Sequence, residues 1–160
     1  MNDVFIKQAQ TDWELEQAFA IRQEVFVFEQ KMFEQTDRDE NDTDAVLLIA
    51  LINGGVAGTV RVFSENGNGS WVGGRLAVKK EFRGTKAGSL LVQEAVRLAA
   101  ERRAKRFWAR IQLANVAFFE KLGWKAAGPV VFYRGYPHRV MVADLKGAAM
   151  AKSPCNPETE

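Results

Sequence analysis

Three apolar runs rich in β-branched residues and separated by turn sequences are the feature that most restricts the fold of this chain. They span 45–51, 56–63 and 71–78, and Asn53-Gly54-Gly55 joins the first two. Runs of this length bounded by turn residues predict consecutive antiparallel strands. The third run contains Gly73-Gly74, which indicates a bulge or a backbone that another group approaches closely. The centre of the chain is therefore predicted to be a β-meander.

Helices and further strands are predicted on either side of the meander. The segment 11–14, Thr-Asp-Trp-Glu, has the form of a capping box and predicts a helix that runs to about residue 28. Its apolar positions Ala18, Ile21, Val25 and Phe28 are expected on one face directed at a core. The other predicted elements are strands at 5–9, 106–111, 126–133 and 138–145, and helices at 89–103 and 115–122.

Composition and charge narrow the class of protein. The formal net charge of +2 is too small to argue for a nucleic-acid partner, and no apolar run approaches the roughly 20 residues that a membrane span needs. The N-terminal sequence lacks the basic and apolar regions of a signal peptide, so we expect a cytoplasmic protein. The only cysteine, Cys155, lies in a polar tail over 147–160 that we expect to be disordered. Neither a disulfide nor a metal site is therefore predicted.

An acidic segment over 34–44 follows the first predicted helix. Its Asp37-x-Asp39-x-Asn41 spacing is similar to the start of a calcium-binding loop. The sixth position is Asp42 instead of glycine and the twelfth is a leucine instead of glutamate, so the segment fails as such a loop. We interpret it as a solvated loop, with attraction of a cationic substrate as the alternative.

The segment 83–88, Arg-Gly-Thr-Lys-Ala-Gly, connects the last strand of the meander to the long helix. A helix start offers unpaired backbone N–H groups and a positive dipole end, both of which attract phosphate. Gly84 and Gly88 let the backbone approach an oxyanion, and the Arg83 guanidinium suits a pyrophosphate. Neither P-loop spacing nor a dinucleotide-binding fingerprint is present. The segment is predicted to be either a diphosphate site for another cofactor or a purely structural glycine turn.

On these residues the chain resembles the GNAT-type N-acyltransferases. Arg83 and Gly88 match the two ends of that family's pyrophosphate loop, and 76–78 is similar to its pantetheine-binding strand. The segment 118–124 is similar to the family's Phe-Tyr-Glu-Lys-Leu-Gly-Phe sequence. The resemblance covers nearly the whole of a single domain expected over 1–146. More narrowly, segments 25–30, 71–76 and 137–145 are similar to a GNAT subgroup associated with bacterial nitrilase gene clusters.

The resemblance implies a fold, a cosubstrate and an activity. The fold is α/β (α+β), with a central mixed and mostly antiparallel sheet of about six to seven strands flanked by helices. The activity is transfer of an acetyl or short acyl group from acetyl-CoA, or another short acyl-CoA, to the amine of a small molecule by direct attack in a ternary complex, without a metal. A non-catalytic acyl-CoA-binding or sensory module is the alternative, and a homodimer is the assembly that we consider. The implied cofactor-binding residues are Leu76, Ala77, Val78, Arg83, Gly84, Thr85, Lys86, Ala87, Gly88, Ser89, Gln112, Phe118 and Phe119.

Two departures from the family pattern bear on catalysis. Lys86 stands where the family has a glycine, so it either hinders a backbone contact or reaches a phosphate. Phe119 stands where many members carry the tyrosine that protonates the departing thiolate. A thiol of pKa ~8.5 leaves unprotonated at a cost of roughly 2 kcal/mol at pH 7, so catalysis can survive this loss. Tyr133 and Tyr136 are alternative donors.

The attacking amine must be neutral, so a base is expected near it. Glu29, at the end of the first helix beside the expected acceptor groove, and His138, the only histidine, are the candidates. The resemblance implies that a backbone N–H of the strand ending at Val78 stabilises the developing oxyanion.

Three further polar residues are candidates for the acceptor site. Arg110 and Gln112 fall on one face of an extended segment, and Arg75 lies in the last strand of the meander. We interpret them either as a site for a carboxylate on the acceptor or as ordinary surface residues. Asn115, at a strand-to-helix junction, is predicted to cap the following helix.

Overall fold

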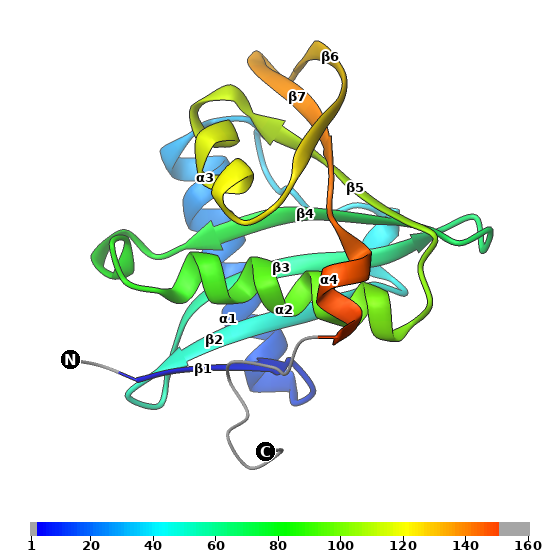
Figure 1. The fold of residues 1–160 in the computed structure, drawn as a ribbon. Helices are drawn as coiled ribbons and strands as arrows, with labels where there is room; N and C mark the ends of the chain where they lie inside the picture. Colours follow the sequence, from blue (N-terminus) through cyan, green and yellow to red (C-terminus); the bar gives the residue numbers. More distant parts are fainter. Residues whose placement is uncertain (1–2, 151–160) are drawn as a thin grey trace.

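Seven strands form one mixed sheet in the computed structural model, which describes residues 3–150 (Figure 1). The strand order is β1-β2-β3-β4-β5-β7-β6, and only the β4–β5 pair is parallel. This confirms the α/β class and the mostly antiparallel sheet predicted from the sequence. The strands are β1 (Val4–Gln8), β2 (Val46–Ile52), β3 (Gly55–Glu65), β4 (Ser70–Val78), β5 (Arg106–Gln112), β6 (Lys125–Tyr133) and β7 (Tyr136–Val142).

Helices cover both faces of the sheet (Figure 1). Side chains alternate between the faces of β2: Leu48 and Ala50 join the apolar cluster that includes α2, whereas Leu47 and Ile49 join the cluster that includes α1. A strand buried on both sides accounts for the continuous apolar run in the sequence. The helices are α1 (Asp12–Arg22), α2 (Ala87–Glu101), α3 (Val116–Lys121) and α4 (Leu145–Met150), with short 3-10 turns η2 (Glu40–Asp42), η3 (Lys80–Phe82) and η4 (Leu113–Asn115).

The first helix begins as predicted but ends differently. The capping box is present, because Thr11 Oγ1 accepts from the Glu14 N–H and Glu14 Oε1 accepts from the Thr11 N–H, both at 3.1 Å. After Arg22 the chain continues as a π-helix, η1 (Gln23–Glu29). The wider turn displaces later side chains from the 3.6-residue stripe. Phe28 is consequently 69% exposed, and its predicted place in the core is wrong.

The predicted meander is confirmed, and its first turn follows from two residues. Asn53 and Gly54 both have positive φ, 53° and 82°, as a type I′ hairpin turn requires. The expected irregularity in the third strand is also present. Thr59 pairs with Ala77 and Arg61 with Gly74, so β4 carries one extra residue between these pairs. Arg75 lies in this bulge with φ 53°.

β4 and β5 pair only at their beginnings. The parallel register joins Ser70 with Arg106 and Val72 with Trp108, and no further pair follows although both strands continue. The Phe107 ring packs closely on Gly73 where the pairing ends, since it would lie 2.9 Å from a Cβ placed on that glycine. The two strands diverge beyond this point (Figure 1). Residues of both strands line a pocket there.

The acidic loop is only partly solvated: most of its residues are exposed, but the prediction is wrong for three of its aspartates. Asp37 is 1% exposed, and its Oδ2 accepts from Arg22 Nε at 2.7 Å and from Arg75 Nε at 3.0 Å. Two further aspartates belong to the same cluster of charged side chains. One of them, Asp42, accepts hydrogen bonds from Arg22 Nη1 and Nη2 at 2.8 and 2.9 Å. We call this set the Arg–Asp network, and its members are Arg22, Arg61, Arg75, Asp37, Asp39 and Asp42.

The last helix crosses residue 146, where the domain is expected to end. Helix α4 continues to Met150 and packs against α2 (Figure 1). The remainder of the predicted tail, including Cys155, lies outside the described residues. Within the described range, no helix has the length and apolar character needed to cross a membrane, and no cluster of three metal-ligating side chains occurs.

Candidate active site

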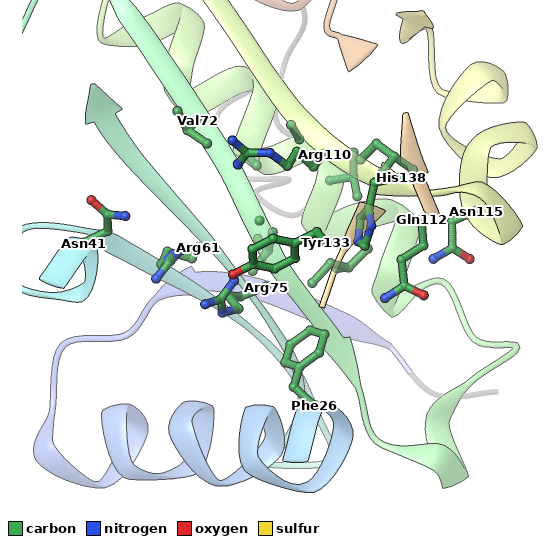
Figure 2. Close-up of a pocket in the computed structure, with 18 of the residues that line it drawn as sticks. Phe26, Asn41, Arg61, Val72, Arg75, Arg110, Gln112, Asn115, Tyr133 and His138 are labelled. Atoms are coloured by element: carbon green, nitrogen blue, oxygen red, sulfur yellow. The ribbon is translucent and has the colours of Figure 1, made fainter. Parts of the chain in front are cut away.

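A cavity of about 240 Å³ lies where β4 and β5 separate (Figure 2). Gly74, Arg75 and Leu76 line it from β4, and 109–112 line it from β5. Helix α2 closes one side with Val92 and Ala95. Three of the predicted site residues that come from distant parts of the chain meet here, namely Gln112, Phe119 and His138, and Tyr133 stands among them.

His138 is buried in the cavity wall and has a defined hydrogen-bonding state. Its Nδ1 lies 2.7 Å from the carbonyl oxygen of Tyr136, which can only accept, so Nδ1 carries the proton and Nε2 retains its lone pair. Burial lowers the pKa of His138, and the positive charge of Arg110 lowers it further, against the opposing effect of the Tyr136 hydrogen bond. A neutral imidazole with a free Nε2 can accept a proton at pH 7.

Glu29, the other candidate base, is placed outside the cavity. Its two carboxylate oxygens accept from Arg83 Nη1 and Nη2 at 2.6 and 2.7 Å. The hydrogen bonds from Arg83 lower the pKa of Glu29, so its carboxylate is a weaker base than an isolated glutamate. Arg83 in turn donates from Nε to the carbonyl oxygen of Val78 at 3.0 Å. The sequence-predicted base and the sequence-predicted phosphate ligand thus bind one another.

The predicted diphosphate loop forms the start of α2. Gly84 has φ +93°, a conformation that favours glycine. Thr85 Oγ1 donates to the carbonyl oxygen of Phe82 at 2.6 Å and accepts from the Ala87 N–H at 3.2 Å, which shapes the turn. Lys86 is the exposed N-cap residue, and its own side chain makes no cap hydrogen bond. This exposed, cationic helix start fits a diphosphate.

The remaining predicted cofactor residues connect the loop to the cavity. Ser89 Oγ donates to the carbonyl oxygen of Lys86 at 3.1 Å, within the first turn of α2. Phe118 lies over that turn, since its ring would be 3.7 Å from a Cβ on Gly88. Ala77 and Val78 continue β4 from the cavity toward the loop. A path therefore leads from the helix start along β4 to the cavity.

Phe119 and Asn115 occupy the wall near α3. Phe119 is 6% exposed and packs edge-on against Trp124 at 5.3 Å between ring centroids, so it contributes an apolar surface. Asn115 stands at the N-cap of α3 but makes no side-chain cap hydrogen bond, and it lines the cavity instead. The prediction that Asn115 caps this helix is wrong.

The two tyrosines of the last hairpin have different surroundings. Tyr133 lines the cavity and meets His138 edge-on, with 5.7 Å between ring centroids. The Tyr136 hydroxyl donates to the carbonyl oxygen of Gln30 at 2.7 Å, so its proton is already used. Gln112 Nε2 donates to the side chain of the same Gln30 at 3.0 Å. Of the two tyrosines, only Tyr133 lines the cavity.

Sequence reasoning missed Arg61 and Asp39, which also line the cavity. Arg61 is 4% exposed and donates from Nη1 to Asp39 Oδ1 at 2.7 Å. An arginine inside the apolar run 56–63 was a usable signal, because an arginine is almost never fully buried without a partner.

Comparison with known proteins places the chain in a family. Residues 8–124 match the model of the acetyltransferase (GNAT) family, so the chain belongs to the GNAT family of acetyltransferases. A Bacillus subtilis (strain 168) protein that is named as an acetyltransferase is 30% identical over 139 residues. The match covers 85% of this chain and 93% of that protein.

Solved structures agree with this fold. An acyl-CoA N-acyltransferase from Pseudomonas aeruginosa superposes with a TM-score of 0.75 at 24% identity, over 90% of this chain and 100% of that chain. An aminoglycoside 6′-N-acetyltransferase solved with coenzyme A gives a TM-score of 0.69 at 16% identity, over 88% of this chain and 97% of that chain. At these identities the structural likeness extends to the fold.

Proposed function

We propose that this protein is an acyl-CoA-dependent N-acetyltransferase that moves an acetyl or short acyl group from CoA to the amine of a small molecule, in the cytoplasm. The observation that carries the proposal is the cavity between the separated ends of β4 and β5, which a neutral histidine lines and from which β4 leads to the exposed start of α2. The CoA complex of the aminoglycoside acetyltransferase, which shares the fold, supports the choice of cosubstrate. We also propose that the protein belongs to the GNAT subgroup associated with bacterial nitrilase gene clusters.

The start of α2 would hold the diphosphate of the cosubstrate. Backbone N–H groups of the first turn point out of the helix, and Arg83 and Lys86 add positive charge beside them. Arg83 must exchange Glu29 for a phosphate oxygen in order to take part. Acyl-CoA supplies the activated carbonyl carbon and the thiol leaving group.

His138 is our choice of base over Glu29. His138 lines the cavity, and its unprotonated Nε2 removes a proton from the attacking amine, whose nitrogen forms the new bond to the carbonyl carbon. The bond from that carbon to sulfur breaks, and the electron pair leaves with the sulfur. A backbone N–H of β4 next to the bulge stabilises the negative charge on the carbonyl oxygen.

The sulfur leaves either as thiolate or with a proton from Tyr133. Phe119 cannot donate a proton, and Tyr136 uses its own on Gln30. Because the thiol pKa is only about 1.5 units above neutral pH, departure as thiolate costs roughly 2 kcal/mol, which a catalyst tolerates.

A non-catalytic acyl-CoA-binding module is the second candidate, and Phe119 is the observation that favours it. One experiment separates the two functions. Release of free thiol from acetyl-CoA is measured with a panel of small primary amines, and acetyl-CoA binding is measured by calorimetry on the same sample. Amine-dependent thiol release supports the enzyme. Tight binding without thiol release from any amine would reject it in favour of the binding module.

A further inference from the structure

The charged residues of the cavity wall do not balance one another. Its arginines are Arg61, Arg75 and Arg110, and its only lining acid is Asp39. Arg61 and Arg75 belong to the Arg–Asp network, in which three arginines face three aspartates. Arg110 lies outside that network. The wall is therefore neutral except for the charge of this one side chain.

Arg110 makes no ion pair with any residue between 3 and 150. Its guanidinium stacks on the Trp108 ring, 5.1 Å from the centroid, and leaves its donors exposed. The acid across the neighbouring hollow is Glu65, which accepts hydrogen bonds from Trp108 at 3.2 Å and from Ser70 at 3.0 Å. Five N–H donors on a charged group thus border the cavity without a carboxylate partner.

Arg110 and His138 lie on the same face of the sheet. Gln112 pairs with His138 and Arg110 pairs with Val140, so Arg110 and His138 are diagonal neighbours across β5 and β7. Such neighbours lie roughly 7–8 Å apart. In Figure 2 both side chains border the same cavity, with Arg110 toward Val72 and His138 toward Gln112. A small molecule can reach the two groups at once.

We propose that the acyl acceptor is a small amine that carries a carboxylate, and that Arg110 binds this carboxylate while the amine lies beside His138. The proposal rests on the acetyltransferase function proposed above and names its substrate class. A guanidinium binds a carboxylate through two parallel N–H bonds, which fixes the position of the amine as well as adding affinity.

The charge of the site favours a carboxylate over other groups. A single uncompensated arginine matches one negative charge, whereas a phosphate carries about −1.5 to −2 at pH 7 and would leave charge unmatched. A purely cationic amine would instead be repelled by Arg110 and find no unpaired acid among the lining residues. An amino acid or a related amino carboxylate meets both requirements.

The test compares amino acids with their carboxamides, which have the same size but no negative charge. Initial rates of thiol release are measured for α-amino acids, β-alanine and γ-aminobutyrate beside the matched amides and 2-aminoethyl phosphate, and each kcat/KM is corrected for the fraction of neutral amine. The variants are Arg110→Gln and, as matched control, Arg106→Gln. Arg106 lies on the same strand and stacks on the same Trp108 ring, but it does not line the cavity.

We expect the wild type to prefer carboxylates and the ratio of kcat/KM for carboxylate over amide to fall about 10- to 100-fold in Arg110→Gln, with no change of that ratio in Arg106→Gln. A wild type that prefers amides or the phosphate, or an Arg110→Gln variant that loses both activities equally, would overturn the proposal. If no amine is acetylated although acetyl-CoA binds, the proposed enzyme function fails. Calorimetry of the same amino acids with CoA present then decides on the site: weaker binding to Arg110→Gln supports it, and equal or absent binding overturns it.

Discussion

Replacing Asp37 with alanine should be among the most destabilising single changes in this protein. The carboxylate is 1% exposed, and one of its oxygens accepts from both Arg22 and Arg75. The Arg22 side chain is fully buried, so removing Asp37 leaves part of a buried positive charge uncompensated. Breaking a buried ion pair by removing one partner costs about 3–5 kcal/mol. Arg22 keeps its bidentate contact with Asp42, which places the expected cost near the lower end of that range.

Such a cost is a large part of the total free energy of unfolding of a domain. Domains are stable by about 5–15 kcal/mol, and in a chain of this size each kcal/mol lowers the melting temperature by roughly 2–4 °C. At about 3 kcal/mol, Asp37→Ala should therefore melt roughly 6–12 °C below the wild type. Asp44→Ala is the matched control, because Asp44 ends the same acidic loop and is exposed.

Urea unfolding followed by circular dichroism and by tryptophan fluorescence measures the free energy of unfolding for both variants. Asp37→Asn adds a third point, because it keeps an acceptor atom but loses the charge, and it should fall between the wild type and Asp37→Ala. If Asp37→Ala and Asp44→Ala unfold within 1 kcal/mol of each other, the Arg–Asp network does not contribute as its burial implies.

Three further changes test the site and its support. Arg83→Ala should weaken acetyl-CoA binding by about 1–3 kcal/mol in calorimetry, the scale of a charge-assisted contact, and unchanged affinity would remove Arg83 from the cofactor site. His138→Gln should lower kcat/KM by about 10²–10⁴-fold. Because burial lowers the pKa of His138, the wild-type kcat/KM, corrected for neutral amine, should be flat at pH 7 and fall only below about pH 6.5, and an identical acidic limb in the Gln variant would exclude this base. Gly73→Ala should destabilise the protein by about 1–3 kcal/mol in urea unfolding, since its Cβ would lie 2.9 Å from the buried Phe107 ring, whereas Gly74→Ala, with no atom within 4 Å, should clash with nothing.

Sequence patterns were sufficient where local chemistry determines structure. Alternating apolar runs, the Asn53-Gly54 turn and the Thr11 capping box each act over a few residues, and all are present in the structure. The bulge in β4 followed from adjacent glycines, although Arg75 adopts the left-handed conformation there.

Predictions failed where distant residues decide the outcome. Aspartates of the acidic loop turn inward because their partners Arg22, Arg61 and Arg75 come from three other elements, and no local pattern reports such partners. The exposed Phe28 follows from a π-helical turn that the apolar spacing does not reveal. For the site, the resemblance to the GNAT family identified the residues of the loop 83–88. It did not show that Glu29 binds Arg83, because that contact joins side chains 54 positions apart.

The contact between Arg83 and Glu29 makes cosubstrate binding an exchange of one anion for another. Both side chains are about two-fifths exposed, so mobile ions weaken the existing pair as well as the pair that a phosphate would form. Raising the ionic strength therefore acts in opposite directions on the two halves of the exchange. Affinity for acyl-CoA should vary less with salt than a count of phosphate charges implies, and the free protein keeps the Arg83 charge of the loop neutralised until a diphosphate arrives.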